Sequence, residues 1–256
     1  MVHKFFSPDQ AEAYKALATR TDSKFEVHYF GFHALASTTR LLLAVSGADF
    51  KSTAPPEGTW ATEYKPHTPF GVMPIIRETS PDGKHVLNIS ESDAIERYLS
   101  RKFGLLGKDG YEELIINQFV SSEASMASTI LAKVFSVRDN EELKAANKAK
   151  LLEGPIPSFV AAHEKHLSEN PAAVAKGLKD GNGHYVGENF SLADVKLIYV
   201  LDFIGVMSGD VISKEKTPAL WKVKETMEAA PSVKAWKETP GFKEISERNF
   251  QFVGYY

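Results

Sequence analysis

A proline and a serine eighteen residues apart carry the clearest chemical signal in this sequence. Pro74 precedes a short apolar run, and Ser92 opens a stretch of helix-forming residues. Because proline lacks the amide that a sheet ladder needs, the Met73-Pro74 bond belongs at a strand end or a bulge. At the start of a helix, the Ser92 hydroxyl and the adjacent free amides can hold an anion. The two residues therefore mark a strand end and an anion-binding helix start.

The elements around this pair form a small mixed domain. Apolar runs at 73–77 and 85–89 flank Ser80-Pro81-Asp82-Gly83, which is typical of a tight turn between strands. Residues 25–30 alternate as a strand, with Phe25, Val27 and Tyr29 on one face. A helix at 36–46, a short strand at 49–52 and a proline-rich loop at 54–68 complete the order β-α-β, loop, β-β-α. That order fits a small sheet covered by helices.

The rest of the chain has helical periodicity. Apolar residues recur every three or four positions over 111–137, which predicts one long helix. Ser191 and Asp194 form a capping-box pattern ahead of the apolar run 195–206. Further helices are expected at 141–152, 158–168, 218–228 and 233–238, with a loop at 171–183. We predict four segments: a surface extension at 1–24 with a short capped helix, a domain at 25–101, a glycine-rich linker at 102–110 and a helical domain at 111–256.

Composition narrows the class of protein. The 256 residues are 43% hydrophobic, enough for a sizeable core, and the formal charge is −3. This balance predicts no binding to nucleic acid or to an anionic membrane. No apolar run approaches the ~18 residues of a membrane span, and residues 1–24 lack a secretory core. The chain has no cysteine, so thiol chemistry requires a bound cosubstrate, and we expect a cytoplasmic location.

Several motifs resemble the cytosolic glutathione transferases, and most closely their tyrosine-type alpha and sigma classes. The segment from Phe70 to Pro74 followed by Glu91-Ser92-Asp93 resembles the glutathione-binding half of that family. Tyr29 lies eleven residues before Arg40, as in those two classes, and 185–194 resembles the cap of a buried helix. The resemblance spans most of 25–242. It implies an α/β plus all-α fold, in which a thioredoxin-like domain precedes an all-helical domain, and a homodimer.

The resemblance makes Tyr29 the expected catalytic residue, with glutathione as cosubstrate and no metal ion. A free cysteine thiol has a pKa of ~8.5, so only a few per cent is ionised at neutral pH. A tyrosine hydroxyl that donates to the sulfur favours the thiolate. Ser37 is the alternative activator, although its spacing to Arg40 is one residue shorter than in the serine-type classes. Tyr29 as a plain core aromatic and Ser37 as a local cap are the structural alternatives.

The same resemblance assigns the glutathione contacts. Glu91 and Ser92 would bind the γ-glutamyl end, and the Met73 backbone would pair with the cysteinyl part, next to a cis Pro74. Lys65 and Trp60 would contact the glycyl carboxylate. If these residues do not bind glutathione, they would instead be explained as a helix cap, surface charges or packing contacts.

Two positions depart from the family pattern. The family's Gly-Arg-Ala-Glu segment is here Ala34-Leu35-Ala36-Ser37, so an arginine that would help to polarise the thiol is missing, and Val72 replaces a common glutamine. The electrophile pocket is expected to be apolar and to lie between the domains. Its candidate residues, each of which could instead be core or frayed tail, are Phe32, His33, Met126, Ile130, Phe250, Phe252, Tyr255 and Tyr256.

These features predict a glutathione transferase that conjugates the thiolate to a small apolar electrophile, such as an epoxide, activated alkene or aryl halide, in detoxification or secondary metabolism. A glutathione-dependent isomerase would use the same thiolate and release glutathione unchanged. A noncatalytic ligand-binding or structural relative is the third hypothesis, which the altered 34–37 segment favours and the retained Tyr29, Glu91 and Ser92 oppose.

Overall fold

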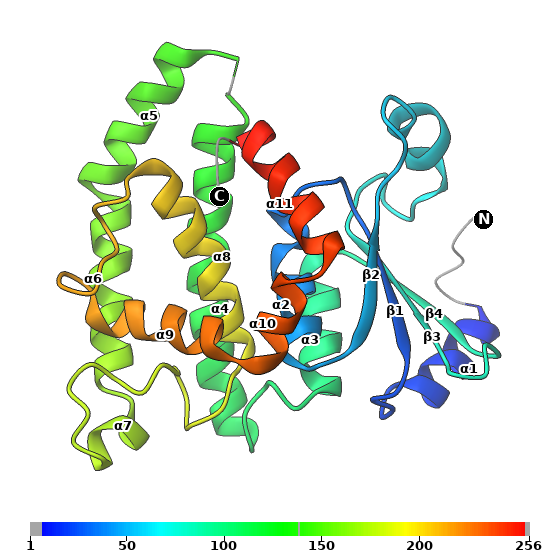
Figure 1. Cartoon of the computed structure of the whole chain (residues 1–256), viewed down its shortest axis with the longest axis horizontal. Coiled ribbons are helices and arrows are strands. Elements are labelled where there is room, and N and C mark those ends of the chain that lie inside the picture. Colours follow the sequence, from blue (N-terminus) through cyan, green and yellow to red (C-terminus); the bar gives the residue numbers. More distant parts are fainter. Residues whose placement is uncertain (1–6, 138, 254–256) are drawn as a thin grey trace. The chain divides into compact units, whose positions relative to one another are not determined.

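The computed structural model describes residues 7–137 and 139–253, with side chains up to residue 248 (Figure 1). The chain divides into two compact units. Unit 1 comprises Met1–Phe103 together with Ala230–Tyr256, and unit 2 comprises Gly104–Ala229. The N-terminal unit holds a four-stranded mixed sheet and unit 2 is helical, which matches the fold class expected from the sequence.

The sheet of unit 1 has the strand order β2-β1-β3-β4. Its strands are β1 (Lys24–His28), β2 (Asp49–Thr53), β3 (Ile75–Thr79) and β4 (Val86–Ser90). β1 runs parallel to β2 and antiparallel to β3, and β3 and β4 form the expected hairpin. The connection between β2 and β3, expected to be a plain loop, contains two short helical turns, η2 (Trp60–Tyr64) and η3 (Lys65–His67).

The two faces of the sheet differ in polarity because successive side chains alternate. Phe25, Val27, Ile76 and Leu87 are buried on one face. On the other face Glu26 forms an ion pair with Lys51 at 2.6 Å. Helices α2 (Ser37–Val45) and α3 (Ser92–Lys102) contact each other, and α3 also contacts β3 and β4. The 3₁₀ turn η1 (Ala34–Ala36) leads into α2.

The N-terminal helix α1 (Pro8–Leu17) is an integral part of unit 1, not the loosely held surface extension expected from the sequence. Ala13 and Leu17 are buried in a cluster with Leu87 of β4. The Gln10 amide bonds to the backbone of this edge strand at two points, donating to the Val86 carbonyl at 3.0 Å and accepting from the Asn88 amide at 3.1 Å. The side chain of Gln10 therefore pairs with β4 much as a further strand would.

A fully buried ion pair also fixes α1. The Lys102 ammonium lies 2.8 Å from the Glu78 carboxylate, and neither side chain is exposed. Lys102 also donates to the Leu17 carbonyl at the end of α1, and the Tyr98 hydroxyl donates to Glu78. A buried charge is stable only when it is paired and hydrogen-bonded. This ion pair therefore ties α1 and α3 to the inner face of the sheet.

The C-terminal helices α10 (Pro231–Lys237) and α11 (Pro240–Val253) group with unit 1, whereas the sequence places them in the helical domain. α10 packs against α2, and the Ser232 hydroxyl donates to the Val45 carbonyl at 3.3 Å. Trp236 lies 6.0 Å from Phe50 between ring centroids. α11 has no counterpart among the expected helices.

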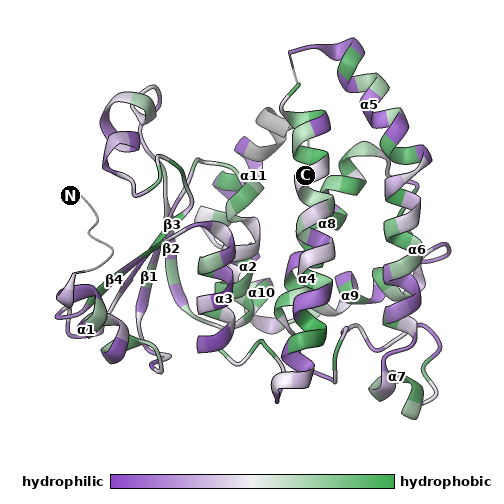
Figure 2. Cartoon of the chain, turned by 180° about the vertical axis from the view of Figure 1, so that it is seen from behind, coloured by the Kyte–Doolittle hydropathy of each residue, from purple (hydrophilic) through white to green (hydrophobic). Residues whose placement is uncertain are grey.

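Unit 2 is built around α8 (Leu192–Met207), most of whose side chains are buried. α8 packs against α4 (Gly110–Ile130) and α9 (Pro218–Ala229). Hydrophilic and hydrophobic residues are interspersed along the more exposed α5 (Figure 2). The remaining elements are η4 (Leu131–Phe135), α5 (Glu141–Glu153), α6 (Pro155–Ser168) and α7 (Pro171–Ala175), the last within the expected loop 171–183. Within the described residues, no helix has the length and apolar character to cross a membrane.

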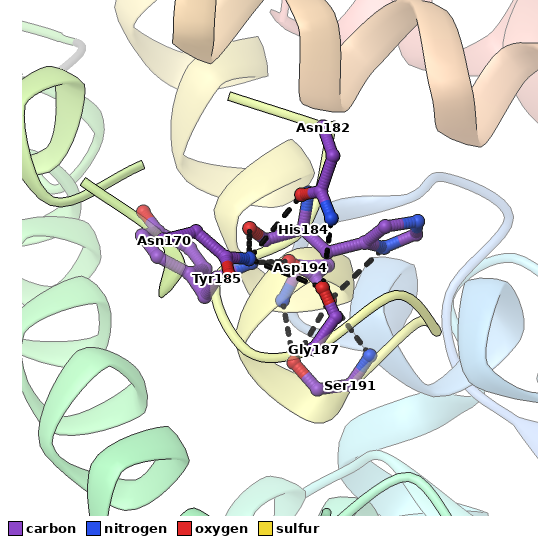
Figure 3. A network of polar contacts seen from close by, with 7 residues as sticks. All are labelled: Asn170, Asn182, His184, Tyr185, Gly187, Ser191 and Asp194. Atoms are coloured by element: carbon purple, nitrogen blue, oxygen red, sulfur yellow. Dashed lines mark hydrogen bonds and ion pairs between the residues drawn. The ribbon is translucent and has the colours of Figure 1, made fainter. Parts of the chain in front are cut away.

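A buried polar network starts α8 (Figure 3). The Asp194 carboxylate accepts from the Ser191 amide at 2.7 Å, the Ser191 hydroxyl at 2.8 Å and the Tyr185 amide at 2.8 Å. The predicted capping box is therefore confirmed. Asn170 donates to the His184 carbonyl at 2.7 Å, which holds the preceding loop in place.

We expect Asp194→Ala to lower the free energy of unfolding by about 3 kcal/mol or more, because each hydrogen bond to a charged group contributes ~1.5–3 kcal/mol. Asp109→Ala is a matched control, since Asp109 caps the exposed start of α4. Losing that exposed cap should cost about 1 kcal/mol. Urea unfolding followed by circular dichroism measures both. Equal losses would show that the Asp194 network is an ordinary cap.

Candidate functional site

One row of paired residues runs across the sheet at the edge where β1 ends. Thr53 pairs with His28, His28 with Ile75, and Ile75 with Ser90. The chain leaves or enters the sheet directly beyond this row. The register therefore brings the candidate residues of three separate strands to the same edge.

Tyr29, Pro74 and Glu91 are the residues that stand next to this row. Tyr29 follows His28, Pro74 precedes Ile75, and Glu91 follows the last residue of β4. The sequence singled out all three residues. Their common position is a consequence of strand pairing and could not be read from spacing alone.

Tyr29 is 4% exposed, and its hydroxyl accepts from the Leu35 amide at 3.4 Å. Its own amide donates to the Thr53 carbonyl at 3.0 Å, which fixes its place beyond the strand. Burial raises the pKa of Tyr29 to about 12. The phenol therefore keeps its proton at neutral pH. Because the oxygen already accepts from Leu35, that proton is left to donate to another group.

Arg40 is the functional residue whose role the sequence analysis missed. It is 1% exposed, and its guanidinium donates to the carbonyls of Phe32 at 2.7 Å and Phe30 at 3.3 Å and to the Ser52 hydroxyl at 3.1 Å. Its Cζ lies 5.7 Å from the centroid of the Tyr29 ring. Burial lowers the pKa of Arg40 to about 10, which leaves it charged at neutral pH. An arginine before three leucines on a buried helix was the signal that could have revealed this clamp.

The segment that departs from the family pattern has an unusual backbone. Ala34 has φ of 31°, on the left-handed side that favours glycine. Leu35 occupies the position of the family's arginine. It is exposed and uncharged, so it does not supply the charge expected near Tyr29. Ser37 is buried as the first residue of α2, and Ala36 occupies the N-cap position without a side-chain cap. Ser37 is therefore not the N-cap of α2, although its amide caps the end of η1 by donating to the Ala34 carbonyl.

The Met73-Pro74 peptide bond is cis, and Pro74 immediately precedes β3, as expected from the resemblance and from the missing proline amide. The Met73 side chain is buried. In the part of the chain that the structure describes, the Met73 amide and carbonyl make no backbone hydrogen bond. They are free to pair with an extended ligand in the manner of an added strand.

Glu91 and Ser92 begin α3, and the backbone of Glu91 is strained. Glu91 has φ of 71°, and it makes no side-chain cap for the helix. Non-glycine residues in this region cost ~1–3 kcal/mol and cluster at functional sites. Ser92 is half-buried at the first helical position, where unbonded amides favour an anion.

Trp60 and Lys65 lie in the helical turns between β2 and β3. The Trp60 ring is perpendicular to Phe30, with centroids 5.5 Å apart. Lys65 is exposed, and its stem passes Gly71, because a Cβ added there would lie 3.4 Å from the Lys65 Cε. Lys65 is therefore close to the segment that leads into Met73.

The residues expected to line the electrophile pocket fall in different units. Phe32 stacks on Phe30 and lies 5.6 Å from the Tyr29 ring between centroids. His33 is buried, and its Nε2 lies 3.2 Å from the Ser246 hydroxyl of α11, which fits core packing. Burial lowers its pKa to about 3. Met126 and Ile130 are buried in α4 of unit 2. The side chains of Phe250, Phe252, Tyr255 and Tyr256 lie outside the described residues.

Comparison with known proteins identifies the family. Residues 128–240 match the family model described as the glutathione S-transferase C-terminal domain. The protein named glutathione S-transferase 2 of Manduca sexta is 32% identical over 222 residues, which is 87% of this chain and 99% of that protein. This chain belongs to the glutathione S-transferase family. Glutathione S-transferase 1 of Ascaris suum is 29% identical and covers 83% of this chain and 95% of its own.

Solved structures agree with this transferase in fold. The sigma-class glutathione S-transferase of Fasciola hepatica superposes with a TM-score of 0.70 at 24% identity and covers 84% of this chain and 95% of its own. A structure named prostaglandin synthase D of Nilaparvata lugens superposes with a TM-score of 0.67, also at 24% identity, over 84% of this chain and 98% of its own.

For this transferase we expect Arg40→Lys to lower the free energy of unfolding by about 2 kcal/mol or more, because an ammonium cannot reach acceptors that a planar guanidinium spans. Arg77→Lys is the control, since Arg77 is exposed on the polar face of the sheet. Urea unfolding compares the two variants. Equal stability of both would contradict the clamp.

Proposed function

We propose that this chain conjugates the thiolate of glutathione to a small apolar electrophile, such as an epoxide, activated alkene or aryl halide. One observation carries the proposal: a buried, protonated Tyr29 hydroxyl stands at the sheet edge where the Met73 backbone is free. The reaction serves detoxification or secondary metabolism. Membership of the transferase family supports glutathione as cosubstrate.

The residues at this edge suit a tripeptide with charged ends. The free amide and carbonyl of Met73 would pair with the cysteinyl part of glutathione. The start of α3 at Ser92 would take the γ-glutamyl carboxylate by its free amides, and Glu91 would take the ammonium. Lys65 and Trp60 would hold the glycyl end. Because the cysteinyl part would then lie beside Pro74, its sulfur would reach the sheet edge that also holds Tyr29.

Tyr29 would act as a hydrogen-bond donor in this reaction. Its pKa of about 12 keeps the phenol protonated throughout the range where a thiol titrates. The donated hydrogen bond stabilises the thiolate over the thiol and lowers the thiol pKa. The buried Arg40 charge beside the Tyr29 ring acts in the same direction. The thiolate then attacks the electrophilic carbon.

We expect Tyr29→Phe to raise the pKa of the bound thiol by ~1–2 units, and to lower the thiolate fraction at neutral pH about ten- to a hundredfold. An ultraviolet titration of the thiolate, run beside the conjugation rate, measures both effects. Ser37→Ala is the matched control and should change neither. If Ser37→Ala abolishes activity while Tyr29→Phe leaves the pKa and rate intact, the serine is the activator.

A glutathione-dependent isomerase is the second candidate, and one fold neighbour is named as a prostaglandin synthase. The two candidates differ in the fate of glutathione. Incubation with glutathione and a panel of electrophiles, followed by mass spectrometry, distinguishes them. Covalent adducts support conjugation, whereas isomerised product with unchanged glutathione supports the isomerase.

We further propose a cytoplasmic homodimer in which Phe70 makes an apolar contact at the dimer interface. Phe70 is 57% exposed in the loop before Met73, although a large apolar side chain is normally buried. We expect a dimer mass for the wild type at micromolar concentration, and a shift toward monomer for Phe70→Ser. Light scattering measures both. A monomeric wild type would overturn the dimer.

A further inference from the structure

Ser122 differs from Ser121 and Ser125, two other exposed serines of α4. The hydroxyls of Ser121 and Ser125 donate back to carbonyls of their own helix, at 2.7 Å and 2.9 Å. The Ser122 hydroxyl instead lies 3.0 Å from Nε2 of His163 on α6. Ser122 is exposed, while His163 is only 3% exposed. A serine at hydrogen-bond distance from an imidazole is the first requirement of a nucleophile and its base.

Each ring nitrogen of His163 has one hydroxyl partner. Its Nδ1 contacts the Tyr185 hydroxyl. Burial, together with the charge of the buried Glu123 carboxylate, raises the pKa of Tyr185, which keeps the phenol protonated. With the His163 proton on Nδ1, the Tyr185 oxygen accepts from Nδ1–H. The Nε2 of His163 then carries the lone pair, and the Ser122 hydroxyl donates to it.

Aromatic packing holds the relay formed by Ser122, His163 and Tyr185 in place. The His163 ring stacks on Phe159 at 3.9 Å between centroids, and Tyr185 stacks on Phe119 at 4.2 Å. Burial lowers the pKa of His163 to about 4, so the imidazole is neutral at neutral pH and Nε2 can accept a proton. The order from the surface inward is nucleophile, base and orienting hydroxyl, which resembles the arrangement of nucleophilic serines.

We propose that Ser122 is a nucleophilic serine that takes an acyl or phosphoryl group from activated esters or fluorides, independently of glutathione. The Ser122 oxygen forms the new bond to carbon or phosphorus. Its proton passes to His163 Nε2, and the bond to the leaving group breaks with the electron pair on that group. No oxidant or second reactant is needed.

The surroundings of Ser122 restrict the chemistry to good leaving groups. Ser122 stands inside α4, where main-chain amides bond to carbonyls four residues earlier, so they are not available to stabilise an oxyanion. The weakly basic His163 also favours reactive electrophiles. We therefore expect a single, lasting modification and no turnover.

The test treats the full chain with a fluorophosphonate probe in the absence of glutathione. Attack by Ser122 expels fluoride, so the intact mass rises by one phosphonyl group, and peptide mapping locates it. We expect Ser122 to be labelled at least tenfold faster than Ser121 and Ser125 of the same molecules. This internal comparison needs no variant. Equal labelling of the three serines, or no adduct at Ser122, would overturn the proposal.

Variants then test the relay. Ser122→Ala should remove the adduct, and Ser121→Ala should retain it. Tyr185→Phe keeps the ring stacked on Phe119 but removes the hydroxyl that orients His163, so labelling should slow at least tenfold in protein that retains its circular dichroism spectrum. An unchanged labelling rate in folded Tyr185→Phe would contradict the relay. Conjugation with glutathione is scored separately, so failure of either function is recognised alone.

Discussion

The pairing of β1 with β3 is the constraint on which unit 1 depends. Because side chains alternate across a strand, a slip of one residue would move Ile76 from the buried face to the polar face. The same slip would displace Pro74 from the edge at which Tyr29 follows β1. One register therefore decides both the packing of the core and the meeting of the site residues. The proposed pairing of glutathione with the Met73 backbone would depend on the same register.

Buried charges recur where loops and helices must be held in one arrangement. Arg40 bonds to four neutral acceptors, while Glu78 and Lys102 form a closed ion pair. Hydrophobic contacts are nondirectional, and they would allow several positions for the segment between β1 and α2. Hydrogen bonds from a guanidinium have fixed directions. Arg40 thus gives the turn beside Tyr29 a defined shape, even though the turn contains Ala34 in place of glycine.

Local patterns predicted the elements whose signals lie within a few residues. The strands, the hairpin turn and the capping box of α8 were found because alternation, Asp82-Gly83 and the Ser191–Asp194 spacing act locally. The cis bond and the start of α3 followed from the resemblance. Spacing could therefore suggest which residues belong to the candidate site, but not how they are arranged.

The remaining features depend on partners far away in the chain. In the sequence Gln10 is an ordinary polar residue, and its role follows only from its hydrogen bond to β4. In the same way, α11 is held by long-range contacts such as that between His33 and Ser246. The helical turns at 60–67 were not predicted, because the prolines of this segment usually indicate a loop. The Ser122 relay joins α4, α6 and the loop before α8, and no local pattern connects those segments.

The contacts of α1 also determine the order in which unit 1 can be assembled during synthesis. Gln10 must wait for Val86 and Asn88, and Leu17 must wait for Lys102, so the partners of α1 are made long after it. At roughly 5–20 residues per second, this delay is on the order of several seconds. A helix of ten residues is marginal in water without tertiary partners. Because α1 is synthesised before its partners, it is among the last elements of unit 1 to become stable, and the sheet keeps an open edge until α1 docks.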